Sequence, residues 1–222
     1  MIHISLPDGS KLEVAPGASL FEVAEAIGPG LAKAAVCAHV DGALRDLRER
    51  VNEGATVTFF TRGSEEALSV LRHTTTHIMA QAVKRLFPEA QLGIGPAIED
   101  GFYYDFGVDQ PFTPEQLTLI EDEMRRIIAA AIPIERLEVS KAEAKKLLSE
   151  HNELLKLELL ADLEDETITM FRQGEFIDLC RGPHLKNTGD VKQDAFKLLS
   201  VAGAYWRGDE SRPMLQRIYK TT

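Results

Sequence analysis

Two pairs of side chains in this sequence have the types and spacing of a chemical site. His73 and His77 lie four residues apart in a segment with helical periodicity, so they project from one side of a helix, one turn apart. Cys180 and His184 have the same spacing around Gly182-Pro183, a pair typical of a turn. Each pair alone also fits a structural interpretation: a solvated helix face for the histidines, and a buried thiol with a surface imidazole for the other two.

Together, the four residues could converge on one site. Three imidazoles and one thiolate are a suitable ligand set for tetrahedral zinc. The same groups also suit a polar site without a metal, and the residue types alone leave both interpretations open. Loops at strand ends often carry functional residues, because the strand fixes the position from which the loop presents them.

Two further polar residues are candidates for the same site. Asp178 precedes Cys180 by two positions, so on an extended strand both side chains point to the same side. Lys156 lies in the apolar run 154–157. Its ammonium either reaches water along the surface or is buried, and burial would suit the amine to proton transfer.

A long helix is expected to carry the histidine pair. Ser64 is a suitable N-cap, and the apolar periodicity continues to about Phe87, where Pro88 stops it. The apolar stripe of this helix lies on the side away from His73 and His77. We therefore expect the histidines to lie off the face that this helix packs against its core.

The remaining elements after residue 62 follow from caps and periodicity. Capping-box residues begin one helix at Thr113 and another at Ser140, and we expect the second to continue past His151 to Leu160. Runs of alternating or β-branched residues predict strands. The expected strands cover residues 102–106, 134–139, 167–172, 175–179, 198–206 and 214–219.

Residues 1–62 have the pattern of a separate small unit. Alternating residues flank a turn at 7–9 and predict a hairpin, and Ser19 and Glu22 form a capping box before a short amphipathic helix. Two strand-like segments follow, and this order is typical of a small β-grasp domain. We expect an α+β fold with two domains, a β-grasp domain at 1–62 and a mixed α/β domain at 63–222.

The composition is that of a folded protein. Hydrophobic residues make up 44% of the chain and charged residues 27%, which excludes disorder as its main state. Cys37 and Cys180 are the only cysteines, too few for a disulfide framework, and the chain shows no signal-peptide or membrane-span pattern. We expect a cytoplasmic protein with no membrane partner. The net charge of −10 opposes phosphate binding, although residues 181–222 carry 8 basic and 4 acidic residues.

The motifs resemble a known family. His73-Thr74-Thr75-Thr76-His77 and Cys180-Arg181-Gly182-Pro183-His184 resemble the paired signature of the tRNA editing domains of threonyl- and alanyl-tRNA synthetases. Residues 1–62 resemble the TGS domain that opens bacterial threonyl-tRNA synthetases, so the resemblance covers essentially the whole chain. Further stretches that resemble the threonyl type are Gly95-Pro96, 101–106, 204–208 and 214–219.

The resemblance implies a proofreading function. The expected reaction is hydrolysis of the ester that joins serine to the 3′ end of threonine tRNA, with threonine rejected by size. The class II aminoacylation core, with its ATP and zinc sites, and the anticodon-binding domain are not recognised in the chain. We therefore expect the N-terminal part of a ligase that forms homodimers through that core. One departure is Ile218-Tyr219-Lys220, where the family usually has Ile-Tyr-Gly.

The resemblance also implies roles for individual residues. His73 and Lys156 are expected to position and activate water as catalytic residues. Threonyl-type editing domains are understood to work without a metal, so none is expected here. Zinc held by His73, His77, Cys180 and His184 is the alternative. The residues expected to bind substrate are His77, Asp178, Cys180, His184, Tyr104 and Gly95, with Asp178 on the α-ammonium group and Tyr104 near the terminal adenosine.

Two other functions compete with this one. The first is a zinc-dependent hydrolase of the alanyl type, which acts on mischarged alanine tRNA. The second is a non-catalytic RNA-binding or regulatory module, because TGS domains also occur in regulatory proteins. A pure binding module has no need for Lys156, Asp178, Cys180 and both histidine pairs together, which favours the enzyme.

Overall fold

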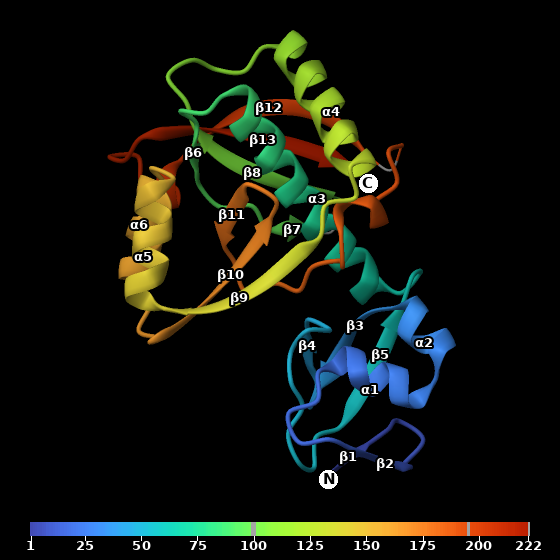
Figure 1. The fold of residues 1–222 in the computed structure, drawn as a ribbon. Helices are drawn as coiled ribbons and strands as arrows, with labels where there is room; N and C mark the ends of the chain where they lie inside the picture. The colour runs from blue at the N-terminus through green and yellow to red at the C-terminus, as the bar shows by residue number, and fades with distance from the viewer. Residues whose placement is uncertain (99–100, 195, 222) are drawn as a thin grey trace. The chain divides into compact units, whose positions relative to one another are not determined.

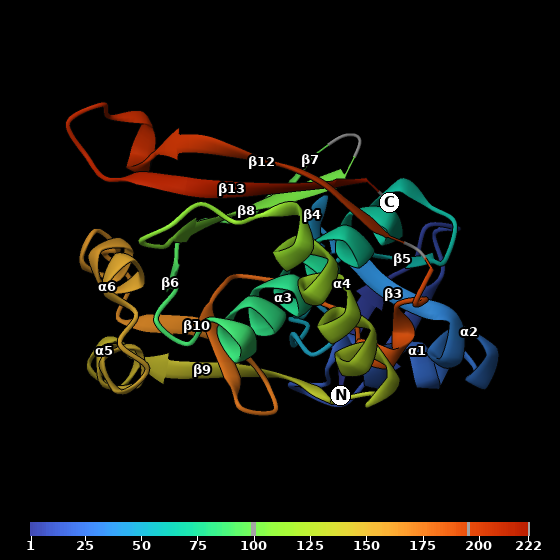
Figure 2. The same ribbon diagram turned by 90° about the horizontal axis from the view of Figure 1, so that it is seen from above.

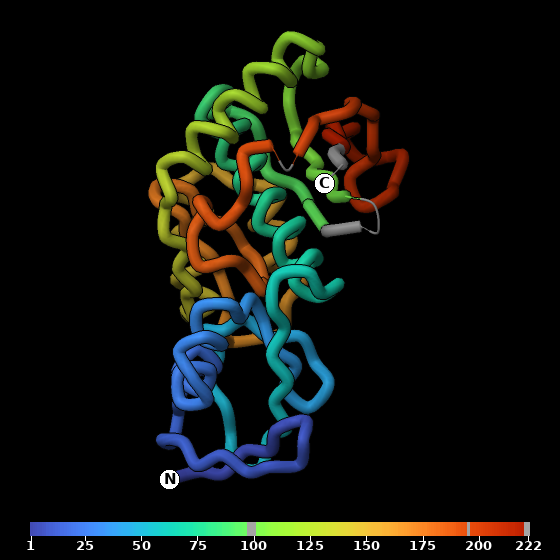
Figure 3. The backbone as a smooth tube through the Cα atoms, turned by 90° about the vertical axis from the view of Figure 1, so that its right-hand side faces the viewer, coloured from blue at the N-terminus to red at the C-terminus, as the bar shows by residue number. Residues whose placement is uncertain are grey.

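The computed structural model describes residues 1–98, 101–194 and 196–221. The chain divides into two compact units, one formed by Met1–Leu71 with Gly182–Leu185 and the other by Arg72–Arg181 with Lys186–Thr222. Figures 1 and 3 follow the backbone from the blue N-terminus to the red C-terminal strands. None of the helices within the described ranges has both the length and the apolar character needed to cross a membrane.

The first unit has the expected β-grasp architecture. A hairpin of β1 and β2 pairs in antiparallel register, and β3 lies between β4 and β5 in a second small sheet. A parallel bridge between Ser5 and Thr56 joins the hairpin to the segment just before β5. The elements are β1 (Ile2–Ser5), β2 (Lys11–Val14), α1 (Leu20–Ile27), α2 (Pro29–Ala34), β3 (Ala35–Val40), β4 (Ala43–Arg45) and β5 (Val57–Thr61).

Helix α1 covers the core of this unit. The predicted capping box is present, with the Ser19 hydroxyl accepting from the Glu22 N–H and the Glu22 carboxylate accepting from the Ser19 N–H. Leu20 and Val23 are buried in the core cluster. Helix α2 was not expected from the sequence: Pro29 occupies its first turn, where a proline starts a helix without losing a hydrogen bond.

The second unit contains two antiparallel sheets. One has the strand order β11-β10-β9, and the other has the order β12-β13-β8-β6 with β7 also paired to β8. The elements are α3 (Glu65–Leu86), which begins before the division between the units, β6 (Gln91–Leu92), β7 (Ala97–Ile98), β8 (Gly101–Gly107), α4 (Pro114–Ala129), β9 (Ile134–Ser140), α5 (Lys141–Glu150), α6 (Leu154–Ala161), β10 (Thr167–Gln173), β11 (Phe176–Leu179), β12 (Lys197–Tyr205) and β13 (Met214–Thr221).

Helix α3 lies between the two sheets in the second unit (Figures 1 and 2). Every residue from 74 to 83 is buried, so its central turns have no solvated face. The interpretation of a solvated helix face therefore fails for His77. A second layer of protein covers the polar side of the helix, and the amphipathic pattern of one helix cannot reveal that layer.

The helix expected to run from Ser140 past His151 is two helices. Helix α5 ends at Glu150, and Asn152 has a φ of 54°, a left-handed conformation that interrupts the helical path. Helix α6 then begins at Leu154 and packs with α5 and the β10–β11 hairpin. The interruption places Lys156 in the first turn of a new helix.

Candidate functional site

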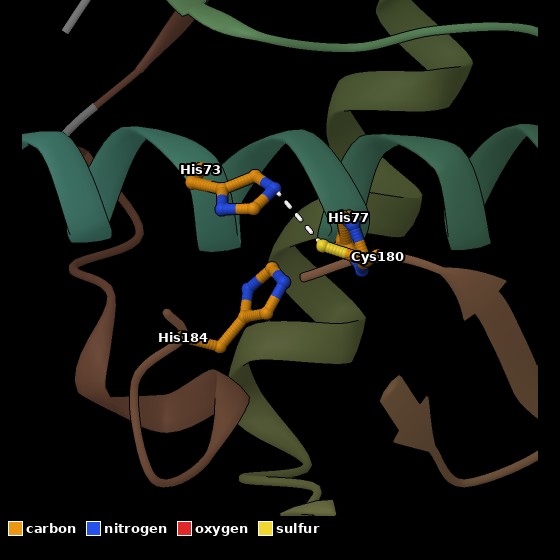
Figure 4. Close-up of side chains that lie close together, drawn as sticks. All are labelled: His73, His77, Cys180 and His184. Atoms are coloured by element: carbon orange, nitrogen blue, oxygen red, sulfur yellow. Dashed lines mark hydrogen bonds between the residues drawn. The ribbon is translucent and has the colours of Figure 1, made fainter. Parts of the chain in front are cut away.

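The two predicted pairs of residues come together. His73 and His77 project from α3 toward Cys180 and His184 (Figure 4). The Cys180 Sγ lies 3.3 Å from the His73 Nε2, and the two imidazoles of α3 meet edge to face with centroids 5.2 Å apart. One nitrogen or sulfur atom from each of the four residues lies within 4.8 Å of the others.

The donor set of this cluster fits zinc. Three imidazoles and a thiolate are ligands that zinc prefers, and tetrahedral zinc holds such atoms roughly 3.3–3.6 Å apart. Because the separations here reach 4.8 Å, a metal would have to draw the side chains inward by about 1 Å. His73, His77, Cys180 and His184 could hold it, and if three of them bound the metal and left one position open, it would supply a Lewis acid that lowers the pKa of a bound water.

A buried ion pair lies against the histidines. Lys156 and Asp178 are 4% and 1% exposed, and the Lys156 Nζ lies 2.7 Å from the Asp178 Oδ1. The other carboxylate oxygen accepts a 2.8 Å hydrogen bond from the Tyr104 hydroxyl and lies 3.5 Å from the His77 Nε2. Burying two charges is costly, and these additional partners offset the cost. Lys156 therefore does not extend to water.

Burial also fixes the protonation of the neighbouring groups. Removal from water lowers the pKa of His77 to about 3, although the Asp178 carboxylate opposes this shift, so the imidazole is neutral at physiological pH. Burial and the Asp178 carboxylate together raise the pKa of Tyr104 well above its usual value. The phenol therefore stays protonated and donates a hydrogen bond to the Asp178 carboxylate.

The β10–β11 hairpin carries Asp178 and ends just before Cys180. Asp178 pairs in register with Phe171, and the Cys180 N–H continues the ladder to the Thr169 carbonyl at 3.4 Å. The expectation that Asp178 lies on a strand leading into Cys180 is confirmed. The strand thus places a carboxylate and, at its end, a thiol near the same helix.

Two buried glutamines lock this hairpin to α3. The Gln173 amide donates to the Gln81 side-chain carbonyl at 2.8 Å and to the His77 backbone carbonyl at 3.2 Å. The Gln81 amide donates in turn to the Gln173 backbone carbonyl and to the Glu175 carboxylate. Because buried amides are costly to leave unpaired, this network holds the histidines in register with the hairpin.

Tyr104 and Gly95 form a packed wall beside the ion pair. Tyr104 is buried, and its ring stacks on Phe106 with centroids 4.9 Å apart. A methyl group added at Gly95 would overlap the Tyr104 ring and lie 2.7 Å from the Thr76 side chain. Gly95 is therefore the residue that lets this loop approach the ring closely.

Comparisons with known proteins agree with the geometry. The family described as the TGS domain matches residues 2–61, and the family described as the threonyl and alanyl tRNA synthetase second additional domain matches residues 168–219. The chain pairs a TGS domain with a second additional domain. Asp178, Cys180 and His184 fall within the matched part of the second additional domain, whereas the histidines of α3 precede it.

Relatives resemble this TGS and second additional domain pair along its whole length. A threonine–tRNA ligase of Citrifermentans bemidjiense is 54% identical over 99% of the chain and 34% of its own length. Those of Desulforamulus reducens and Halalkalibacterium halodurans are 51% and 52% identical over all of the chain and 35% and 34% of their own lengths. The chain spans about a third of the length of the curated relatives it matches.

Some residues of the candidate site were not found by sequence reasoning. Gln81 lies four residues after His77, so the spacing that linked His73 to His77 also includes it, and that spacing could have identified it. Glu175 was predicted only as the first residue of a strand, and Gln173 was given no role. Nothing in their local sequence marks the partners that they contact on α3.

Proposed function

We propose that this chain is the proofreading part of a threonine–tRNA ligase and hydrolyses serine from mischarged threonine tRNA. Serine is threonine without one methyl group, so a site built to bind threonine discriminates against it by only about 10–200-fold. A second site with the opposite preference removes the error. It admits the smaller side chain and excludes the extra methyl group against a densely packed wall.

The observation that carries this proposal is the Lys156–Asp178 ion pair buried beside the histidine and cysteine cluster. A charged pair is costly to bury, so its position next to polar groups with perturbed protonation is typical of a catalytic site. Ester hydrolysis needs a positioned water, a proton acceptor and a positive or hydrogen-bonding group for the developing oxyanion. The cluster contains candidates for each.

His73 and Lys156 are the proposed catalytic residues. Water attacks the ester carbonyl carbon, and its proton passes to the His73 imidazole as the tetrahedral intermediate forms. Lys156, held by Asp178, orients the water and faces the developing negative charge. The bond to the ribose oxygen then breaks, and that oxygen takes a proton, which leaves free serine and uncharged tRNA.

The remaining site residues are proposed to bind substrate. His77, Cys180 and His184 line the pocket and contact the seryl group or the terminal ribose. Asp178 accepts from the α-ammonium group through Oδ1, a carboxylate oxygen that can accept a further hydrogen bond beside its 2.7 Å contact with the Lys156 Nζ. Tyr104 and Gly95, also expected to bind substrate, are proposed to act through the position of Asp178, because the Tyr104 hydroxyl donates to that carboxylate and Gly95 packs against the Tyr104 ring.

The proposal extends to the parent enzyme. The synthetic core, which would bind ATP and zinc and pair the enzyme as a homodimer, lies outside this chain. The partner of the chain itself is the 3′ end of threonine tRNA carrying serine, and the proposed setting is the cytoplasm. Each statement follows from the similarity to threonine–tRNA ligases, of which the chain covers about a third.

Deacylation of seryl-tRNA and threonyl-tRNA by the 222-residue chain tests the proposal. The wild-type chain is expected to hydrolyse the seryl ester and spare the threonyl ester. His73→Ala and Lys156→Ala are expected to reduce the rate by at least about a hundredfold, because each removes a group that acts in the transition state. His151→Ala and Lys146→Ala, at exposed positions, are the matched controls. Equal rates in all five proteins would refute the catalytic assignment.

The zinc-dependent alanyl-type hydrolase remains the second candidate, because the four donor atoms of the cluster lie close together. Metal analysis of protein purified without added zinc distinguishes the two. One equivalent of zinc that is lost, with activity, from His77→Ala would favour the metal enzyme. Binding of tRNA by a wild-type chain that hydrolyses neither seryl nor alanyl esters would favour a non-catalytic RNA-binding module.

A further inference from the structure

A buried ion pair in the first unit lies far in sequence from the catalytic candidates. Asp46 follows β4 directly and is 0% exposed. Its Oδ1 accepts from the Arg48 backbone N–H at 2.9 Å, and the Arg48 Nη1 donates to both carboxylate oxygens at 2.8 and 2.9 Å. The Arg48 guanidinium thus balances the charge of the buried Asp46 carboxylate.

The same two side chains hold a segment that comes more than a hundred residues later. The His184 backbone N–H donates to the Asp46 Oδ2 at 2.9 Å. The Arg48 Nη2 donates to the Leu185 carbonyl at 2.7 Å, and its Nη1 donates to the His184 carbonyl at 3.3 Å. All of these residues belong to the first compact unit, which includes Gly182–Leu185.

These contacts bind both the donor and the acceptor groups of the backbone at residues 184 and 185. One N–H and two carbonyls are bound by a carboxylate and a guanidinium, and hydrogen bonds to charged groups are about twice as strong as neutral ones. The planar guanidinium presents several donors in a fixed arrangement, so it can bind two carbonyls and a carboxylate at once. A lysine at the same position could not reach all three.

The residue held in this way is a member of the candidate site. His184 is one of the four side chains whose donor atoms cluster, and its backbone is bound directly by Asp46 and Arg48. An imidazole turns with the backbone that carries it, so a backbone fixed at both its N–H and its carbonyl restricts where the ring can lie.

We propose that Asp46 and Arg48 are positioning residues for His184, which they hold through the backbone of residues 184 and 185. The inference rests on the proposed function, since it concerns a substrate-binding residue of that site. Asp46 and Arg48 act through the turn and touch no reacting atom. Loss of the clamp displaces His184, which the proposed function places beside the reacting ester, so it lowers the rate of the reaction more than it weakens binding of the tRNA.

Two conservative variants of the full chain test this. Arg48→Lys keeps a positive charge beside Asp46 but cannot bind both carbonyls, and Asp46→Asn keeps the shape while weakening the acceptor for the His184 N–H. We expect kcat for seryl-tRNA to fall about tenfold with KM unchanged, because a site residue misplaced by about 1 Å costs rate. Amide hydrogen exchange at 182–185 is expected to accelerate. Arg45→Ala, at an exposed arginine of β4, is the matched control and should change neither quantity.

The outcomes separate the clamp from the proposed function. A wild-type chain that does not deacylate seryl-tRNA refutes the proposed function, whereas faster exchange at 182–185 in the variants still supports the clamp. An active wild type with unchanged kcat in both variants refutes the positioning role. Unchanged exchange at 182–185 also refutes it, as does a fall in kcat that only follows a fall in the folded fraction measured by thermal unfolding.

Discussion

At the scale of single residues, one carboxylate organises the site. Asp178 contacts an ammonium group, a phenol and an imidazole, each from a different element, and all four groups are buried. The stability of this site therefore depends on the negative charge of Asp178. If that charge is removed, the buried Lys156 ammonium loses its counter-charge.

Asp178→Asn is expected to lower the free energy of unfolding by about 3 kcal/mol, because it leaves the Lys156 ammonium buried without a counter-charge. The double variant Asp178→Asn with Lys156→Met is expected to recover a large part of that loss, since no buried charge remains. Denaturant unfolding measures both. The control is Asp122→Asn on the exposed side of α4, expected to change stability by less than about 0.5 kcal/mol. Additive losses in the double variant would contradict the prediction.

Gly95→Ala tests the packed wall. The added methyl group would overlap the Tyr104 ring, so we expect a loss of about 1–3 kcal/mol in unfolding free energy and weaker hydrolysis through displaced Asp178. Gly30→Ala in α2 has open space around its new methyl group and serves as the control. If both variants were as stable as the wild type, Gly95 would have no packing role.

At the scale of elements, periodicity and caps predicted most helices and strands. The capping boxes at Ser19 and Thr113 and the strands that lead to Cys180 are where the sequence indicates, because local signals determine them. The burial of His77 could not be predicted, since it depends on layers packed against α3 from elsewhere. The break at Asn152 was also missed, because no glycine or proline marks it.

The ion pair between Arg85 of α3 and Glu175, at the turn of the β10–β11 hairpin, should depend on pH. Hydrogen bonds from Arg85 lower the pKa of Glu175 to about 2 in the folded protein, from an ordinary value of 4.5. The unfolded chain therefore binds more protons between these values, and the stabilisation present above about pH 4.5 is lost as the pH falls toward 2.

Glu175→Gln is expected to destabilise the protein at neutral pH and to approach the wild type in acid. Because the pair is partly exposed, added salt should also reduce the difference. Thermal unfolding across this pH range measures the effect, with Glu89→Gln as an exposed control. A wild-type advantage that grew in acid would contradict the sign.

At the scale of the whole molecule, charge limits how this chain meets its proposed partner. The net charge is −10, while tRNA is a polyanion, so we expect weak binding of tRNA at physiological salt and tighter binding at low salt. Titration of labelled tRNA at several salt concentrations measures this. Tight binding that salt does not weaken would show that contacts other than phosphate neutralisation dominate.

The membership of Gly182–Leu185 in the first unit has a consequence for synthesis on the ribosome. Asp46 and Arg48 leave the exit tunnel long before the backbone groups that they bind. At about 5–20 residues per second, that interval is on the order of ten seconds. The first unit therefore acquires its last piece only after the residues between Arg48 and Gly182 have been translated.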